Sequence, residues 1–470
     1  MFPAMTKAND LAFAGAAVQS EMIRSGRCTA REVIEATLAR IEMLNPQINA
    51  FRVVFAEQAL AEADAIDAAG ATDQPMLGVP VAIKDDTDVK GERTAWGSLA
   101  TDPNPVGHDA DVVKRLRAAG AIVIGKTSVP ELTIWPFTET LAFGATRNPW
   151  NIDYATGGSS GGSGAAAAAG LCGVAHGSDG AGSVRIPAAF NGLFGLKTQR
   201  ERISLGPNHF DGWNGMTVYG PLARTVADAA LFMDATADGG PEGGYLAALA
   251  TPPGPLRIAV SLKPPPGSVT KLGGEQRAAI DATAAALREL GHEVYDEEVD
   301  YPVAAFLGTV ARYLRSVTDD VATLPHPERL EHRTKSMARI GGLISDRRLA
   351  QARASEPAVA ARINTIFDRA DAVLMPGTAG PPFKIGQLQD RGALWTLNAA
   401  AARVPWYGVW NAIGQPASSV PAGFDSNGLP LSVQFGARPG DELTLLKIAA
   451  QLEQLRPWAA RRPPLDGPQS

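Results

Sequence analysis

The sequence predicts an α/β fold in which helices cover a central sheet. Short apolar runs alternate with amphipathic segments of helical period, first over residues 77–126 and again over residues 256–299. Helices that alternate with buried strands are typical of a layered α/β architecture. The chain has 470 residues, of which 45% are apolar and 20% charged, so a large folded core is expected.

The first part of the chain is expected to begin with helices. Apolar side chains share one helical face over residues 30–44, and a second helix is expected over residues 54–69. The apolar run LGVPVAIK then ends at Lys84 and is predicted to be a strand. A helix over residues 111–118 and an apolar run over residues 121–126 complete the order strand, helix, strand.

Residues 156–197 hold two loops rich in glycine and serine on either side of a short alanine-rich run. We expect the run SGAAAAAGL to form a helix and residues 171–175 to form a short buried strand. Glycine lets the backbone adopt positive φ and approach a ligand closely. The serines between these glycines are therefore candidates for a functional site.

The second half of the chain continues the alternation. A helix is expected over residues 220–237, and strands are expected at 256–262 and 292–299 on either side of another helix. Residues 301–369 are more charged and mostly helical, and we expect them to form a lobe beside the core. From residue 417 the pattern predicts a strand, a turn, a second strand and a closing helix.

Composition argues against several classes of function. The chain has 43 Lys and Arg against 49 acidic residues, and without a long basic run we expect no nucleic-acid partner. Two distant cysteines, Cys28 and Cys172, favour a reducing compartment, so we expect the cytoplasm. The most apolar window, residues 164–175, is too short to span a membrane, and no signal peptide is expected. No H-E-x-x-H motif or paired Cys/His spacing occurs, so neither a metal nor an organic cofactor is expected.

One motif match indicates nucleotide binding but has the wrong context. Residues 120–127 satisfy the phosphate-loop pattern G-x-x-x-x-G-K-T. Its four variable positions are all apolar and belong in a strand, whereas a phosphate cradle needs an open loop of backbone N–H groups. We therefore expect no phosphate loop.

A second match, G-x-S-x-G, occurs in two registers and offers Ser159 or Ser160 as the nucleophile of an α/β-hydrolase-type esterase. That fold also needs an acid and a later histidine. The candidates by order lie in charged helical or edge contexts and are better explained as surface histidines: His292, His326 and His332.

Lys84, Ser159 and Ser183 form a third and more complete arrangement. A serine nucleophile needs a base, and a lysine can act as one when burial lowers its pKa. A second serine can relay the proton, and the small residues before Ser183 would let backbone N–H groups point at an oxyanion. Alone, Lys84 is more simply a solvated lysine at a strand end. Together the residues predict acyl transfer.

Four motifs extend this arrangement: GVPVAIKD at 78–85, TRNPW at 146–150, GGSSGGSGA at 157–165 and GSDGAGSVRIPAAFNGLFGLK at 177–197. With them the chain resembles the amidase signature family. Similarity continues in GPLARTVADAA, DAVLMPGTA and GQPASSVPAG. The resemblance covers nearly all of the chain, which we therefore expect to be a single amidase domain over 1–470. It would have a signature core at 77–237 and a variable, mainly helical region at 241–369.

This resemblance implies one α/β/α domain with a central mixed sheet, and hydrolysis of a carboxylic amide to an acid and an amine or ammonia. Ser183 would be the nucleophile that forms an acyl-enzyme, Ser159 the bridging serine after a cis peptide bond, and Lys84 the general base. The implied oxyanion donors are the backbone N–H groups of Gly180, Ala181, Gly182 and Ser183. The residues expected to brace the loops are Asp179, Arg185 and Ser160.

Two alternatives remain open. One is the amidotransferase subunit of the same family that releases ammonia from glutamine, although Ile186 stands where that subunit usually has glutamine. The other is a non-catalytic binding protein on the same fold.

Four aromatic residues predict an apolar or aromatic acyl pocket, although core packing explains such residues as well. They are Phe210, Trp213, Trp406 and Trp410. We expect a small-molecule amide as the substrate, and a homodimer is one candidate for the assembly.

Overall fold

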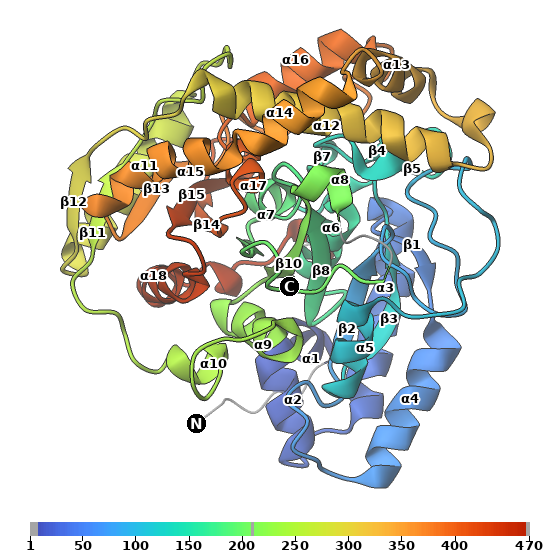
Figure 1. Cartoon of the computed structure of the whole chain (residues 1–470). Helices are drawn as coiled ribbons and strands as arrows, with labels where there is room; N and C mark the ends of the chain where they lie inside the picture. The colour runs from blue at the N-terminus through green and yellow to red at the C-terminus, as the bar shows by residue number, and fades with distance from the viewer. Residues whose placement is uncertain (1–7, 208–210, 467–470) are drawn as a thin grey trace.

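The computed structural model describes residues 8–207 and 211–466, and in them one sheet of eleven strands is surrounded by helices (Figure 1). The predicted α/β class with a mixed central sheet is confirmed. Strands β3, β2 and β8 pair in parallel, as do β13, β11 and β12, while the strands between these groups and the edge strand β1 pair antiparallel. In spatial order the strands are β1 (Phe51–Val54), β3 (Ile122–Thr127), β2 (Pro80–Lys84), β8 (Val174–Asp179), β10 (Val218–Ala223), β9 (Phe194–Lys197), β14 (Ala417–Phe424), β15 (Pro430–Ala437), β13 (Ala372–Pro376), β11 (Arg257–Val260) and β12 (Glu293–Asp296).

The helices come from every part of the chain, and two small ribbons lie outside the main sheet. The helices are α1 (Ala8–Phe13), α2 (Ala16–Arg24), α3 (Ala30–Ile48), α4 (Ala56–Ala69), α5 (Asp111–Ala118), α6 (Gly161–Ala168), α7 (Arg185–Asn191), α8 (Gly212–Gly215), α9 (Val226–Thr236), α10 (Tyr245–Ala248), α11 (Gly274–Glu289), α12 (Val303–Thr323), α13 (His332–Gly341), α14 (Asp346–Ala354), α15 (Glu356–Asn364), α16 (Ala393–Arg403), α17 (Gly408–Ala412) and α18 (Glu442–Leu455). The ribbons pair β4 (Glu139–Thr140) with β5 (Gly144–Ala145) and β6 (Arg147–Asn148) with β7 (Asn151–Ala155).

Two apolar cores lie on opposite faces of the sheet. Successive side chains of a strand point to opposite faces. In β2, Val81 and Ile83 join the core that also includes α5, α9 and α18, whereas Ala82 joins the core that includes α3 and α6. Because both faces are covered, β2 is buried along its whole length. The strand that ends at Lys84 therefore delivers that side chain into the interior.

One predicted helix begins later than its sequence suggested. Residues 220–237 were expected to be helical throughout, but Gly220 to Ala223 belong to β10, and α9 begins after the N-cap Thr225. The β10 strand fills the space between β8 and β9. A Cβ on Gly220 would lie 1.9 Å from the carbonyl oxygen of Leu196, so only glycine permits this approach. The prediction was wrong because pairing with the neighbouring strands, and not the helical spacing of apolar residues, determines the conformation of this segment.

Other boundaries differ less. The strand expected at 171–175 is observed as β8, which begins and ends later in the chain, next to the second glycine-rich loop, and is buried throughout. The match to a phosphate loop at 120–127 lies in the buried, paired strand β3, as its apolar positions predicted.

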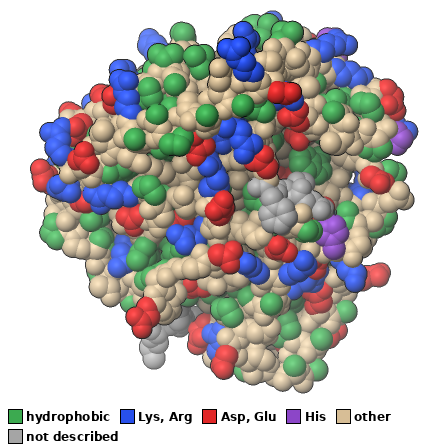
Figure 2. All heavy atoms as spheres, in the orientation of Figure 1, with side chains coloured by type: hydrophobic (Ala, Val, Ile, Leu, Met, Phe, Trp, Pro, Cys, Tyr) green, Lys and Arg blue, Asp and Glu red, His purple; other side chains and the backbone are tan. Residues whose placement is uncertain are grey.

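The yellow and orange helices α12 to α16 lie together along one side of the molecule (Figure 1). Acidic and basic side chains are intermingled over the face seen in Figure 2. Within the described residues, no helix combines the length and apolar character that crossing a membrane would require.

Candidate active site

Lys84 lies at the end of β2 with its side chain fully buried. Its Nζ is 2.7 Å from Ser159 Oγ and 2.6 Å from Ser178 Oγ, and it also donates to the carbonyl oxygen of Ser178 at 3.3 Å. The position of the Lys84 Nζ atom is thus fixed by two hydroxyls and one carbonyl from two other segments. The predicted pair of Lys84 and Ser159 is brought together by the sheet across 75 positions of sequence.

The first glycine loop connects β7 to α6 and contains a cis peptide bond between Gly158 and Ser159. Ser160 is fully buried; its Oγ donates to the carbonyl of Ser178 at 3.1 Å, and its N–H donates to the carbonyl of Ser183 at 3.2 Å. Ser160 therefore ties the first loop to the second. Its hydroxyl has the geometry of a brace and is not open to a substrate.

The second glycine loop follows β8 and leads into α7. Ser183 is 8% exposed and lines two adjacent cavities, whereas Ser159 lines only one of them. Gly182 has a φ of 118°, in the region that favours glycine, and allows the chain to turn before Ser183. This turn presents Ser183 at the point where the two cavities meet.

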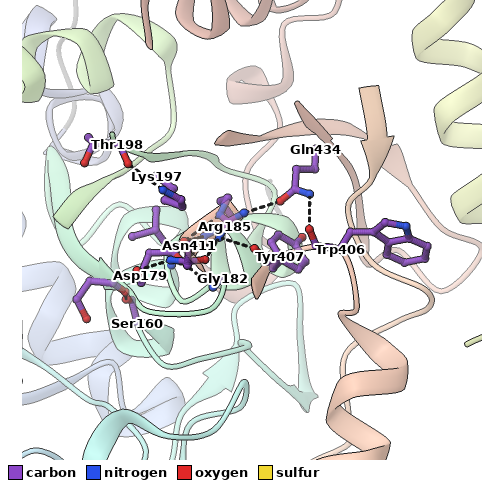
Figure 3. A network of polar contacts seen from close by, with 12 residues as sticks. Ser160, Asp179, Gly182, Arg185, Lys197, Thr198, Trp406, Tyr407, Asn411 and Gln434 are labelled. Carbon is purple, nitrogen blue, oxygen red and sulfur yellow. Dashed lines mark hydrogen bonds and ion pairs between the residues drawn. The ribbon is translucent and has the colours of Figure 1, made fainter. Parts of the chain in front are cut away.

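An ion pair beneath this loop holds it in place (Figure 3). Arg185 Nε lies 3.0 Å from Asp179 Oδ2, and Arg185 Nη2 lies 3.0 Å from Asp179 Oδ1, with both side chains fully buried. Asn411 of α17 donates to Asp179, and Gln434 of β15 accepts from Arg185. Burial alone would raise the pKa of Asp179, but Arg185 outweighs this and the net pKa is lowered. The arrangement fits the predicted bracing pair.

The same carboxylate changes the expected oxyanion hole. The N–H of Gly182 donates to Asp179 Oδ1 at 2.6 Å, so this donor is used inside the loop. The prediction that Gly182 contributes an oxyanion donor is therefore wrong. The three other expected donors, the backbone N–H groups of Gly180, Ala181 and Ser183, remain as candidates.

Asp86 and Ser178 complete the surroundings of Lys84, although neither was singled out from the sequence. Asp86 Oδ2 lies 3.2 Å from Lys84 Nζ and accepts a hydrogen bond of 2.5 Å from Ser178 Oγ. Burial lowers the pKa of Lys84, and Asp86 opposes this effect. Burial alone would raise the pKa of Asp86, but Lys84 and Ser178 hold it below its usual value. Asp85 and Asp86 directly follow Lys84 in the sequence, and these two acidic residues were the signal from which this contact could have been predicted.

His176 lies fully buried on β8, next to this cluster. Its ring packs edge-to-face against Tyr219, with centroids 4.6 Å apart, and neither ring nitrogen has a hydrogen-bond partner among the described residues. Burial lowers the pKa of His176 to about 4, and the charge of Asp86 opposes this only in part. The imidazole is therefore neutral near pH 7 and serves as an apolar packing group.

The two cavities at Ser183 differ in chemistry. The apolar cavity is bordered by Ile134, Trp135, Phe306, Val310, Leu397 and Val404. The polar cavity includes Asp86, Ser159, Ser178, Tyr219 and Asp320. Trp213 lines both, and its ring packs so closely on the loop that a Cβ on Gly180 would lie 2.6 Å from it.

Of the other expected lining residues, Trp406 and Trp410 do not reach either cavity. The indole of Trp406 points away from the Arg185 network (Figure 3) and donates to the carbonyl of Leu262 at 3.2 Å. Trp410 is fully buried against Gly436 of β15. Both predictions were wrong because core packing uses these rings, and Phe210 lies outside the described residues.

The esterase alternative finds no support in the geometry. Ser159 Oγ contacts Lys84, and Ser160 is buried and bonded to Ser178. The histidines expected to serve as the base lie elsewhere: His292 contacts Leu256 and Gln451, His326 lies near Glu328 at 3.6 Å, and His332 begins α13.

Lys84 is buried and bonded to the hydroxyls of Ser159 and Ser178, beside Ser183 on a glycine turn, and residues of these types are able to carry out acyl transfer. Among the described residues, no group of three or more His, Cys, Asp or Glu side chains has the arrangement of a metal site. The comparisons with known proteins agree with this class. The family model for amidases matches residues 32–446.

Relatives in sequence and structure span almost the full chain. "Putative amidase AmiB2" of Mycobacterium tuberculosis H37Rv is 52% identical over 459 residues, which are 97% of this chain and 98% of that protein. The 6-aminohexanoate-cyclic-dimer hydrolase of Paenarthrobacter ureafaciens is 36% identical, covering 96% of this chain and 97% of that protein. A structure of 6-aminohexanoate cyclic dimer hydrolase complexed with substrate matches with a TM-score of 0.85, at 33% identity over 97% of this chain and 99% of that chain. A bacterial aryl acylamidase of the amidase signature family has a TM-score of 0.83, at 25% identity over 95% of this chain and 97% of that chain.

The chain therefore belongs to the amidase family, and its fold is the amidase signature fold. It is an enzyme that acts on amide carbon–nitrogen bonds, as the sequence motifs predicted.

Proposed function

We propose that this enzyme hydrolyses small carboxylic amides through an acyl-enzyme on Ser183, with Ser159 as proton relay and Lys84 as general base. The observation that supports this most directly is the 2.7 Å contact between Lys84 Nζ and Ser159 Oγ, inside a buried site whose cavity also includes Ser183. A hydroxyl at this distance can donate to a neutral amine or accept from an ammonium. Ser159 can therefore move a proton in either direction.

In the first step Ser183 Oγ attacks the amide carbon and transfers its proton to Ser159, which transfers its own proton to Lys84. Backbone N–H groups of the second loop stabilise the oxyanion. The proton then returns through Ser159 to the leaving nitrogen as the carbon–nitrogen bond breaks. Water attacks the resulting ester by the same route, which releases the acid and restores Ser183.

This cycle needs Lys84 in its neutral form. Burial favours that form, because an ammonium loses its hydration in the interior. Asp86 opposes it from 3.2 Å and keeps the pKa of Lys84 from falling as far as burial alone would take it. A base whose pKa is brought toward neutrality is what general-base catalysis requires.

The two cavities suggest which part of the substrate lies where. Ser159 must give a proton to the leaving nitrogen, and it lines only the polar cavity, so we place the leaving amine there. The acyl group then occupies the apolar cavity, where Phe306, Val310 and Leu397 would contact an alkyl or aryl chain. This agrees with the apolar acyl pocket that the sequence led us to expect.

A free-standing hydrolase is favoured over the glutamine-dependent subunit by Ile186, which lines the apolar cavity and offers nothing polar to a glutamine side chain. The purified chain alone should hydrolyse simple amides in a panel of aryl, aliphatic and peptide amides. Activity that appears only with partner subunits would contradict this.

Labelling and substitution together test the mechanism. A fluorophosphonate probe should modify Ser183, identified by peptide mass spectrometry. Ser183→Ala and Lys84→Ala should each lower kcat/KM by about 10⁴-fold, by analogy with other nucleophile–base sets. Ser159→Ala should lower it by about 10²–10⁴-fold. A label on Ser159, or an active Ser183→Ala variant, would overturn the assignment, and no label at all would favour a binding protein.

We further propose a cytoplasmic enzyme with no nucleic-acid partner. Both cysteines are free and buried, as expected for a reducing compartment. Subcellular fractionation tests the compartment. Light scattering of the purified protein tests the homodimer that we retain as one candidate assembly.

A further inference from the structure

Asp320 is a carboxyl group at the catalytic cavity that the mechanism above does not use. It lies in the last turn of α12 and lines the polar cavity together with Ser159 and Ser183. Its Oδ2 is shielded from solvent and has no hydrogen-bond partner among the described residues. A buried carboxylate oxygen without a partner is costly, so its presence at a cavity wall needs an explanation.

Among the described residues, none places a cation beside Asp320. Burial, together with the neighbouring charge of Asp319, raises the pKa of Asp320 to about 7. The C-terminal end of a helix also disfavours an anion. Arg315, one turn earlier on the same helix, is bonded instead to Asp319 and Asp346. Of the described residues that line the polar cavity, none is a lysine or an arginine.

The other walls of the polar cavity suit a positively charged group. Three aromatic residues, Trp96, Trp213 and Tyr219, also line this cavity, and the face of an aromatic ring attracts cations. Asp86 contributes a second carboxyl group. Helix α12 passes over α8 (Figure 1), where Ser316 accepts a 2.8 Å hydrogen bond from Asn214, the neighbour of Trp213. This contact fixes the helix that carries Asp320 against the segment that carries the ring.

The position of the cavity decides which part of the substrate would be charged. Ser159 lines the polar cavity but not the apolar one, and in the proposed mechanism it protonates the leaving nitrogen. The group that reaches Asp320 therefore belongs to the amine half of the amide and not to the acyl half.

We propose that Asp320 is a specificity-determining residue that selects amides whose leaving amine bears a second, positively charged nitrogen. The inference rests on the proposed orientation of substrate at Ser183 and Ser159. The preferred substrates are then monoacylated short diamines with an apolar acyl group, and the released product is the free diamine. Asp320 contacts substrate only and takes no part in proton transfer.

A matched pair of substrates tests this. N-(2-aminoethyl)benzamide has a cationic leaving group at about pH 8, and N-propylbenzamide replaces its ammonium by a methyl group at nearly equal size. The wild-type enzyme should prefer the cationic amide by at least about tenfold in kcat/KM, since close charge pairs in desolvated sites are worth that much. In Asp320→Asn and in Asp320→Ser this ratio should fall at least about tenfold. In Asp319→Asn, which removes a charge from the exposed side of the same turn, the ratio should remain as in the wild type.

Each outcome decides a separate question. A wild-type enzyme without preference, or a preference that both Asp320 variants retain, would overturn the inference while leaving the amidase mechanism intact. Failure to hydrolyse either benzamide, together with failure of Ser183 to label, would instead contradict the proposed function. Melting temperatures of the variants within a few degrees of the wild type confirm that the ratios refer to folded enzyme.

Discussion

The two glycine loops differ from the helices that cover the cavities, α12 and α16, in how their polar side chains are used. In the loops, the polar groups of Ser160, Asp179 and Arg185 are bonded to the loops themselves or to the sheet. In the covering helices, α12 contributes Phe306 and Val310 to one cavity, and to the other it contributes Asp320, whose Oδ2 has no hydrogen-bond partner among the described residues. We therefore expect the loops to fix the chemistry by rigid backbone geometry, and the covering helices to set selectivity through side chains that few other groups depend on.

The largest contrast should appear when a methyl group is added to each region. A Cβ on Gly162, in the first turn of α6 directly after the first loop, would lie 2.4 Å from both the carbonyl oxygen of Ala50 and the nitrogen of Ser128. These are backbone atoms that cannot move aside, so Gly162→Ala should lower the free energy of unfolding by about 3 kcal/mol. Urea denaturation measures this.

The matched control is Gly392→Ala at the start of α16, where a Cβ meets nothing within 4 Å. Its stability should stay within about 0.5 kcal/mol of the wild type. Equal losses of stability in the two variants would show that the backbone next to the first loop is no more rigid than the covering helices.

The stability of the buried strand β8, which leads into the second loop, should also depend on pH through His176. Its pKa is lowered to about 4 in the folded protein, against about 6.5 when unfolded. As the pH falls, the unfolded chain therefore binds a proton at His176 before the folded protein does, which favours unfolding. The free energy that neutral His176 contributes to folding is full above about pH 6.5 and is lost as the pH falls toward 4. Between pH 7 and pH 5 the loss should be about 2 kcal/mol.

His176→Phe tests this, since a phenyl ring suits a site without hydrogen bonds beside Tyr219. In urea denaturation, the free energy of unfolding of the variant should decrease less between pH 7 and pH 5 than that of the wild type. The difference between the two decreases should be about 2 kcal/mol. If the variant kept the pH dependence of the wild type, the pKa of His176 would have to be the same in the folded and the unfolded chain, which would contradict this prediction.

Asp86→Asn should shift the pH dependence of catalysis without removing a proposed catalytic residue. An amide can still accept the hydrogen bond from Ser178, but it no longer stabilises the Lys84 ammonium from 3.2 Å. The pKa of Lys84 then falls, and neutral base is available at lower pH. The ascending limb of kcat/KM should move toward acid by about one pH unit. A shift toward alkaline pH would contradict the role given to Asp86.

The smallest effect is expected in the apolar cavity. Val310→Ala removes two methyl groups from the proposed acyl site, and the loss of this contact should lower kcat/KM for a phenyl or alkyl amide by about three- to tenfold. Amides with short acyl groups, such as acetamide, provide the comparison, and their kcat/KM should fall less in the variant. Equal losses across the panel would place the acyl group elsewhere.

The sequence by itself determined the parts of this protein that depend on local chemistry. The helix at residues 111–118 agrees with α5, because amphipathic period and a following glycine fix both ends. Lys84 at the end of an apolar run, and two serines among glycines, identified the residues that the fold brings together. Such signals are readable because strand burial and glycine conformation are properties of short segments.

Only the tertiary structure decided which groups face one another. Nothing local distinguishes Trp213, which lines both cavities, from Trp410, which packs on Gly436. The N–H of Gly182 is bonded to Asp179 only once the loop has folded, and Asp320 reaches the cavity only because α12 crosses α8. The physical reason is that burial and partner choice depend on contacts between distant segments, which a pattern along the chain does not record.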